Sequence, residues 1–105
     1  MSIQTDLKNI KTIPECSKYL SGILKNFTTL YSKVYSDYEN KDFTKQIKAY
    51  QYKGLYMITI SDIDNRQVTE MTVCLTNKKP KVPHPVFPIM ASYAPNSVVY
   101  HFKAN

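Results

Sequence analysis

The sequence predicts an α+β fold in which a long amphipathic N-terminal helix packs on an antiparallel sheet of about three to five strands. Apolar residues recur at helical spacing in the first third of the chain, and apolar and polar residues alternate in the second half. Helices followed by consecutive strands are typical of an antiparallel sheet. We expect the 105 residues to form one domain, helical over 1–40 and strand-rich over 47–105.

The first helical signal is short. Ile3, Leu7 and Ile10 are spaced four and three residues apart, so they define one weak apolar face on a segment that must dock or fray. Thr12 and Glu15 then form a capping box, in which both side chains bond backbone N–H groups at a helix start. A second helix should therefore begin here.

A broad apolar stripe follows, with intervals of one, three or four residues that are typical of an amphipathic helix. It consists of Cys16, Tyr19, Leu20, Ile23, Leu24, Phe27, Leu30, Tyr31, Val34, Tyr35 and Tyr38. We expect an unbroken helix over 13–39, which would be about 40 Å long. Such a helix must cross the molecule beneath the sheet or extend beyond it to meet another chain. Part of the stripe also fits coiled-coil spacing, but charges that would set the pairing are sparse.

The next segment is ambiguous. The spacing of Phe43, Ile47 and Tyr50 fits a helical turn, whereas Lys48, Tyr50 and Tyr52 alternate with Ile47 and Ala49 as in a strand. We expect a helical turn over 42–47 that leads into a strand over 47–53.

The later strands are clearer. Segments 55–62 and 67–76 predict a β-hairpin, because both are rich in β-branched or aromatic residues and alternate in polarity. Four of the six prolines lie within a connector at 79–88, which should be extended and lie outside the centre of a sheet. Shorter strands are expected over 89–93 and 98–102.

The charge favours acidic partners. The 14 basic residues exceed the 8 acidic ones, for a net charge of +6, and residues 71–105 contain no carboxylate side chain. Arg66 is the only arginine, which argues against reading of DNA bases by guanidinium groups. An AT-rich genome would equally explain a surplus of lysine.

Two features bear on the compartment. Cys16 and Cys74 each lie in an apolar pattern and are expected to be buried thiols rather than a disulfide. The chain shows no signal peptide and no apolar run long enough to span a membrane. We therefore expect an intracellular protein, cytoplasmic or nuclear.

No pattern for catalysis is present. The two cysteines and the two histidines, His84 and His101, are too scattered for a metal site, and two glycines are too few for a phosphate-binding loop. We expect Asp62 and Asp64 to stabilise a turn. The sequence thus predicts no enzyme, no cofactor, no bound metal and no small-molecule substrate.

The leading functional hypothesis is a protein-interaction module, acting as an adaptor or subunit of an assembly. Its interface would be the tyrosine-rich end of the long helix, at Tyr31, Tyr35 and Tyr38. The helix would also serve as a homodimer interface, and an exposed sheet edge is a second candidate. A virus-encoded protein that binds host proteins fits the same features.

The alternative hypothesis is a nucleic-acid-binding protein. Tyrosines interleaved with lysines can stack on bases within a positive groove. The contact residues would be Lys48, Tyr50, Tyr52, Lys53, Lys78, Lys79 and Lys81.

Overall fold

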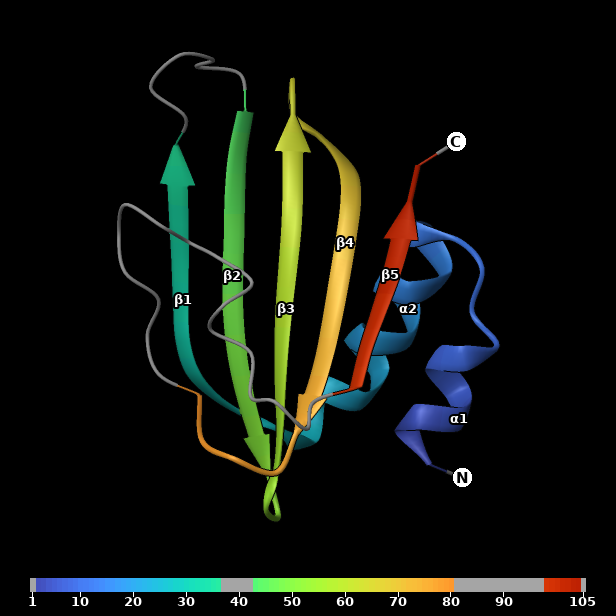
Figure 1. Cartoon of the computed structure of the whole chain (residues 1–105), viewed down its shortest axis with the longest axis vertical. Coiled ribbons are helices and arrows are strands. Elements are labelled where there is room, and N and C mark those ends of the chain that lie inside the picture. The colour runs from blue at the N-terminus through green and yellow to red at the C-terminus, as the bar shows by residue number, and fades with distance from the viewer. Residues whose placement is uncertain (1, 37–42, 81–97, 105) are drawn as a thin grey trace.

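A computed structural model describes residues 2–36, 43–80 and 98–104 of the chain (Figure 1). Two helices are followed by an antiparallel sheet of five strands in the order β1-β2-β3-β4-β5. The antiparallel sheet that the sequence predicts is confirmed. The long N-terminal helix is not.

The elements have these bounds: α1 Ile3–Lys8, α2 Ile13–Ile23, a 3₁₀ turn η1 Leu24–Asn26, β1 Thr28–Ser36, β2 Phe43–Tyr52, β3 Leu55–Asp64, β4 Gln67–Thr76 and β5 Val98–Lys103.

The second helix begins where the sequence predicts, and the first apolar segment forms a short helix. The side-chain oxygen of Thr12 accepts a hydrogen bond from the backbone N–H of Glu15 at 3.2 Å, which confirms the N-cap of α2. The α1 helix docks rather than frays, because Leu7 is only 1% exposed. The hydroxyl of Tyr19 donates to Asp6 Oδ2 at 2.7 Å, so a polar contact also joins the two helices.

The prediction of one helix over 13–39 is wrong. The α2 helix ends at Ile23, the chain makes the η1 turn, and residues from Thr28 to Ser36 form β1. Threonine, tyrosine and valine dominate this strand, and such β-branched and aromatic residues favour a pleated surface over a helix.

A β-bulge explains why the spacing of apolar residues in β1 resembles that of a helix. The register of β1 against β2 shifts between Thr29 and Tyr31. Leu30 and Tyr31, although adjacent, both pack on the side of the sheet that faces away from the helices. Tyr35 packs there as well. The four-residue interval from Tyr31 to Tyr35 fits one face of a helix and, equally, one face of a strand.

The second strand corrects the prediction of a helical turn over 42–47. Residues 43–47 belong to β2, while residue 42 lies outside the described part of the chain. The alternation that predicted a strand is confirmed, because Ile47 and Ala49 are buried on the side of the sheet away from the helices and Tyr50 packs on the helix side.

The hairpin of β3 and β4 is confirmed, and two-residue turns join β2 to β3 and β3 to β4. Both turns place two residues at positive φ, namely Lys53 (46°) with Gly54 (79°) and Asn65 (50°) with Arg66 (68°). This geometry matches the twist of the flanking strands and fixes their register.

The third strand is longer than predicted. It continues to Asp64, so Asp62 and Asp64 lie on β3 rather than in a turn.

The last predicted strand is confirmed as β5. The predicted strand over 89–93 and most of the connector over 79–88 lie outside the described residues.

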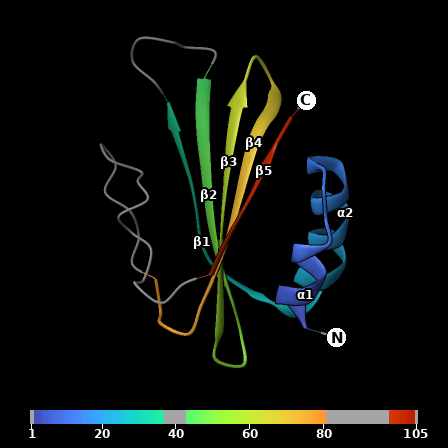
Figure 2. The ribbon, with the colours of Figure 1, turned by 45° about the vertical axis from the view of Figure 1, so that its right-hand side comes forward.

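Both helices lie on one side of the sheet, which we call the helix face; the opposite side is the far face (Figure 2). The helix-face core consists of Leu7, Ile13, Cys16, Leu20, Met57, Met71, Val73, Leu75 and Phe102. The far-face cluster consists of Ile47, Ala49, Ile58, Ile60 and Cys74. Central strands are therefore buried on both sides.

The cysteines are buried thiols, as the sequence predicts: Cys16 lies in the helix-face core and Cys74 in the far-face cluster. Within the described residues, neither helix has the length and apolar character needed to cross a membrane.

Candidate functional site

The helices leave part of the helix face open. The α2 helix contacts β4, whereas β1 lies three strands away at the edge of the sheet (Figure 1). Val34 of β1 is 61% exposed, and Ser32 and Ser36 on the same face are exposed as well. The open area therefore extends over β1 and the neighbouring part of β2.

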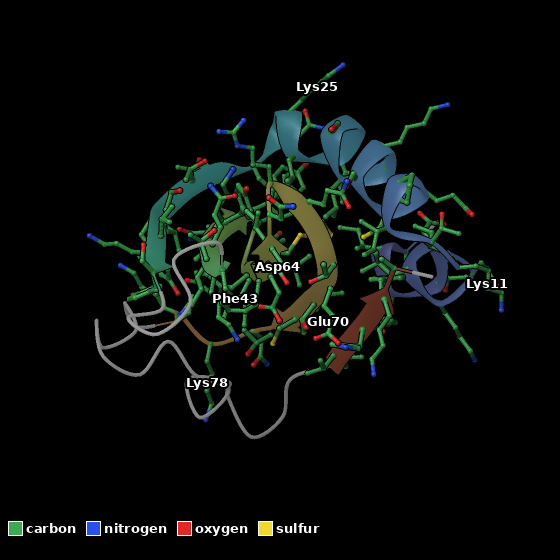
Figure 3. All side chains as sticks on the ribbon, turned by 90° about the horizontal axis from the view of Figure 1, so that it is seen from above. Lys11, Lys25, Phe43, Asp64, Glu70 and Lys78 are labelled. Carbon is green, nitrogen blue, oxygen red and sulfur yellow. The ribbon has the colours of Figure 1, made fainter. Side chains whose placement is uncertain are left out.

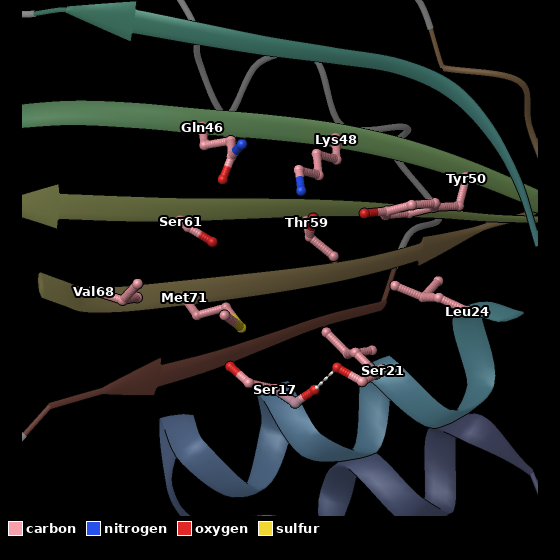
Figure 4. Close-up of a pocket in the computed structure, with 11 residues that line it drawn as sticks. Ser17, Ser21, Leu24, Gln46, Lys48, Tyr50, Thr59, Ser61, Val68 and Met71 are labelled. Atoms are coloured by element: carbon pink, nitrogen blue, oxygen red, sulfur yellow. Dashed lines mark hydrogen bonds between the residues drawn. The ribbon is translucent and has the colours of Figure 1, made fainter. Parts of the chain in front are cut away.

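A pocket of about 290 Å³ lies between α2 and the strands β2, β3 and β4 (Figure 4). Its helix wall consists of Ser17, Leu20, Ser21 and Leu24, and its sheet wall of Gln46, Lys48, Tyr50, Thr59, Ser61, Val68 and Met71. Among these residues are one cation and no carboxylate, so the pocket has a positive polar side and an apolar side.

The polar side of the pocket follows from strand pairing. Lys48 of β2 lies opposite Thr59 of β3, and Gln46 lies opposite Ser61, so four polar side chains meet on one face. Tyr50 follows on β2, with the Thr59 hydroxyl placed to donate a hydrogen bond to its phenol oxygen. Burial raises the pKa of Tyr50, and this hydrogen bond opposes the increase.

Two lysines on β2 have contrasting environments. Lys45, on the far face, has its Nζ 3.3 Å from Oδ1 of Asp62, within ion-pair distance. Lys48, on the helix face, has neutral cross-strand neighbours in Ser32 and Thr59. In the described part of the chain, its ammonium has no ion-pair partner. Lys48 therefore brings an uncompensated positive charge to the pocket.

Of the three tyrosines predicted to form an interface, the structure describes two. Tyr31 and Tyr35 lie on β1, not on a helix, and both are partly buried against the far-face cluster. Burial raises the pKa of Tyr31, and the charge of Tyr35 adds to the increase. Tyr38 lies outside the described residues.

The residues predicted to contact nucleic acid fall into two groups. Lys48 and Tyr50 line the pocket. The others that the structure describes, which are Tyr52, Lys53, Lys78 and Lys79, lie toward the end of the sheet that carries the β2–β3 turn, because Tyr56 at the start of β3 pairs with Thr76 at the end of β4. Lys81 lies outside the described residues.

The turn end combines aromatic and basic groups. The rings of Phe27 and Tyr52 lie 5.3 Å apart, and the ammonium of Lys53 lies 5.3 Å from the centre of the Tyr52 ring. Lys78 extends outward from the ribbon, on a different side from Lys25 (Figure 3).

The far face carries a row of charges across four strands. Asp62 lies opposite Glu70, and basic side chains flank this pair of carboxylates. Lys45 lies beside Asp62, while His101 Nε2 and Lys103 Nζ lie 3.8 and 4.0 Å from the carboxylate of Glu70. The charges of the two lysines offset the repulsion between the carboxylates. Among the described residues, no group of three or more histidine, cysteine, aspartate or glutamate side chains is arranged to bind a metal ion.

Sequence reasoning missed Gln46, Thr59 and Ser61. A signal was present, because Thr59 and Ser61 share a strand face with Met57, which packs against the helices. Polar residues on the covered face of a strand indicate a place where the helix does not seal the core.

Comparisons of the chain with protein-family models, with curated proteins and with solved structures find no match.

Proposed function

We propose that this protein is a non-enzymatic protein-interaction module that binds an extended acidic segment of a partner along β1. The observation that carries the proposal is the exposure of Val34, which exceeds that of the other large apolar residues in the described part of the chain. In an outer strand, alternate N–H and C=O groups point away from the sheet and can pair with an added strand. Val34 would then pack against the partner's side chains.

Charge supports an acidic partner. The sequences of β1 and β2 contain Lys33, Lys45 and Lys48 and no carboxylate. Because Lys45 is paired with Asp62, the charges of Lys33 and Lys48 remain available. Such an edge attracts acidic segments and disfavours basic ones. The proposal replaces the interface on a long helix, which the fold excludes.

Substitution of Val34 should test this surface. We expect Val34→Asp to weaken binding of a fluorescent peptide that alternates glutamate and valine by tenfold or more, because it removes apolar contact and adds repulsion. Fluorescence anisotropy measures the affinity. Val98→Asp is the matched control, since Val98 is an exposed valine on the other outer strand.

The control variant should bind the peptide as the unmodified protein does. Equal affinities for Val34→Asp and the unmodified protein, or peptide-induced NMR shifts centred on β5 instead of β1, would contradict the proposal.

Nucleic-acid binding is a second candidate, and one observation favours it. Tyr52 is exposed beside Lys53, and Lys78 and Lys79 follow the strand that ends nearby. An exposed ring with lysines around it can stack on an unpaired base while the lysines bind phosphates.

Salt dependence tests this candidate. We expect binding of a single-stranded oligonucleotide to weaken log-linearly with salt, with a slope of about −0.7 for each phosphate contact. Replacing both Lys53 and Lys78 with glutamine should reduce the slope by about 1.4. Lys11→Gln, on the connection between α1 and α2, is the control. A slope that the double variant leaves unchanged would exclude this end of the sheet as the binding surface.

A further inference from the structure

We infer that the pocket between α2 and the sheet binds an amphipathic organic anion: a small molecule whose carboxylate or phosphate group pairs with Lys48 and whose apolar part packs between the helix and the sheet. This inference concerns a different site from the partner-binding edge of β1, although the charge of Lys48 contributes to both. It concerns a ligand class for which the sequence alone gave no indication.

The size of the pocket suits a small ligand. Its volume of about 290 Å³ lies just below the range of about 300–1,000 Å³ that is usual for small-molecule sites, which suits a small ligand. The walls come from separate layers, α2 on one side and the strands β2, β3 and β4 on the other, so the fold fixes their separation. A ligand would lie between two packed elements rather than on a loop.

The polar side selects for negative charge. Lys48 is partly buried, and in the described residues its ammonium has no counter-ion, which makes a bound anion favourable. The amide of Gln46 and the hydroxyl of Ser61 flank it on the same face and can donate hydrogen bonds to the same anion (Figure 4). A cationic ligand would find no carboxylate in the lining.

The apolar side selects for a hydrocarbon part. Leu20 of α2 and Leu24 at the start of η1 face the pocket together with Val68 and Met71 of β4. Methionine adapts readily to ligands of different shape. A fully polar anion would leave these side chains against water, whereas an alkyl or aromatic group would cover them.

The test uses octanoate and octyl phosphate as anionic probes and octanol as the neutral one, with affinities measured by NMR titration. At least one anion should bind tenfold or more tightly than octanol and shift the amide signals of the pocket strands β2 and β3. Preference between the two anions identifies the headgroup. Equal binding of octanol and both anions, or shifts located elsewhere, would overturn the inference.

Variants separate charge from shape. Lys48→Met should remove the preference for the anion over octanol, whereas Lys33→Met, an exposed lysine on β1, should preserve it. Ser21→Phe, at an exposed position of the helix wall, should fill the pocket and weaken binding of all three probes tenfold or more. Circular dichroism confirms that each variant is folded. Retained anion preference in a folded Lys48→Met protein would overturn the inference even if peptide binding at β1 is confirmed.

Discussion

Phe102→Ala should lower the free energy of unfolding by about 3–5 kcal/mol, because it removes a buried aromatic ring and leaves a cavity. Phe102 is 5% exposed, pairs with Met71 across β4 and β5, and packs in the helix-face core. A domain of this size has a total stability of about 5–15 kcal/mol. The variant should therefore be close to unfolding at 37 °C.

Urea denaturation monitored by circular dichroism measures this loss. Lys103→Gln is the matched control on the same strand, because the Lys103 side chain is 69% exposed and lies on the opposite face of the sheet. It should change stability by no more than about 0.5 kcal/mol. A loss below about 1 kcal/mol for Phe102→Ala would show that β5 does not close the core in solution.

Alkaline pH should destabilise the fold through buried acids that keep their protons. Burial raises the pKa of the Cys16 thiol from 9.0 to about 11. Below pH 9, both the folded and unfolded states hold this proton. Between pH 9 and 11 the unfolded chain releases it first, so the free energy of unfolding should fall by about 1.4 kcal/mol per pH unit.

Tyr19 adds to this effect at higher pH. Its pKa is raised by burial, by its hydrogen bond to Asp6 and by the charge of that carboxylate. The folded state therefore retains the phenol proton at a pH where the unfolded chain has lost it, and stability falls further above about pH 10.

Unfolding in urea at pH 8 and pH 10.5 tests the linkage. The unmodified protein should lose at least about 2 kcal/mol between these conditions, whereas Cys16→Ala should lose about 2 kcal/mol less than the unmodified protein does. The comparison uses the change with pH, so the cavity left by the substitution cancels. Ser17→Ala, an exposed neighbour, should follow the unmodified protein. Identical pH slopes for Cys16→Ala and the unmodified protein would contradict the assigned cause.

The sequence predicts the sheet better than the helices, because the alternation of apolar and polar residues along a strand is a local pattern. It correctly predicted the β3–β4 hairpin, the placement of Ile47 and Tyr50 on opposite faces of the sheet, and the N-cap of α2 at Thr12. The error arose where Tyr31 and Tyr35, four residues apart, fit both periods. Their strand lies at an edge, where partial burial blurs the alternation that identifies a strand.

The pocket could not be predicted for a different reason. Lys48 and Tyr50 were identified as functional candidates from their spacing, but Ser17 and Ser21 come from a helix whose position over the sheet is a tertiary property. Moreover, the prediction carried the helix past Ile23 through the residues that form β1, so the open part of the helix face could not be foreseen.

The order of strands in the sheet has a consequence for synthesis of the chain. Among the described strands, every pairing joins neighbours in the chain, so β1 to β4 can pair during translation as soon as each leaves the ribosome. The pairing of β4 with β5 must wait until residues 77–97 have been made. Until then the backbone edge of β4 that pairs with β5 is open, and the nascent chain is vulnerable to aggregation at this stage.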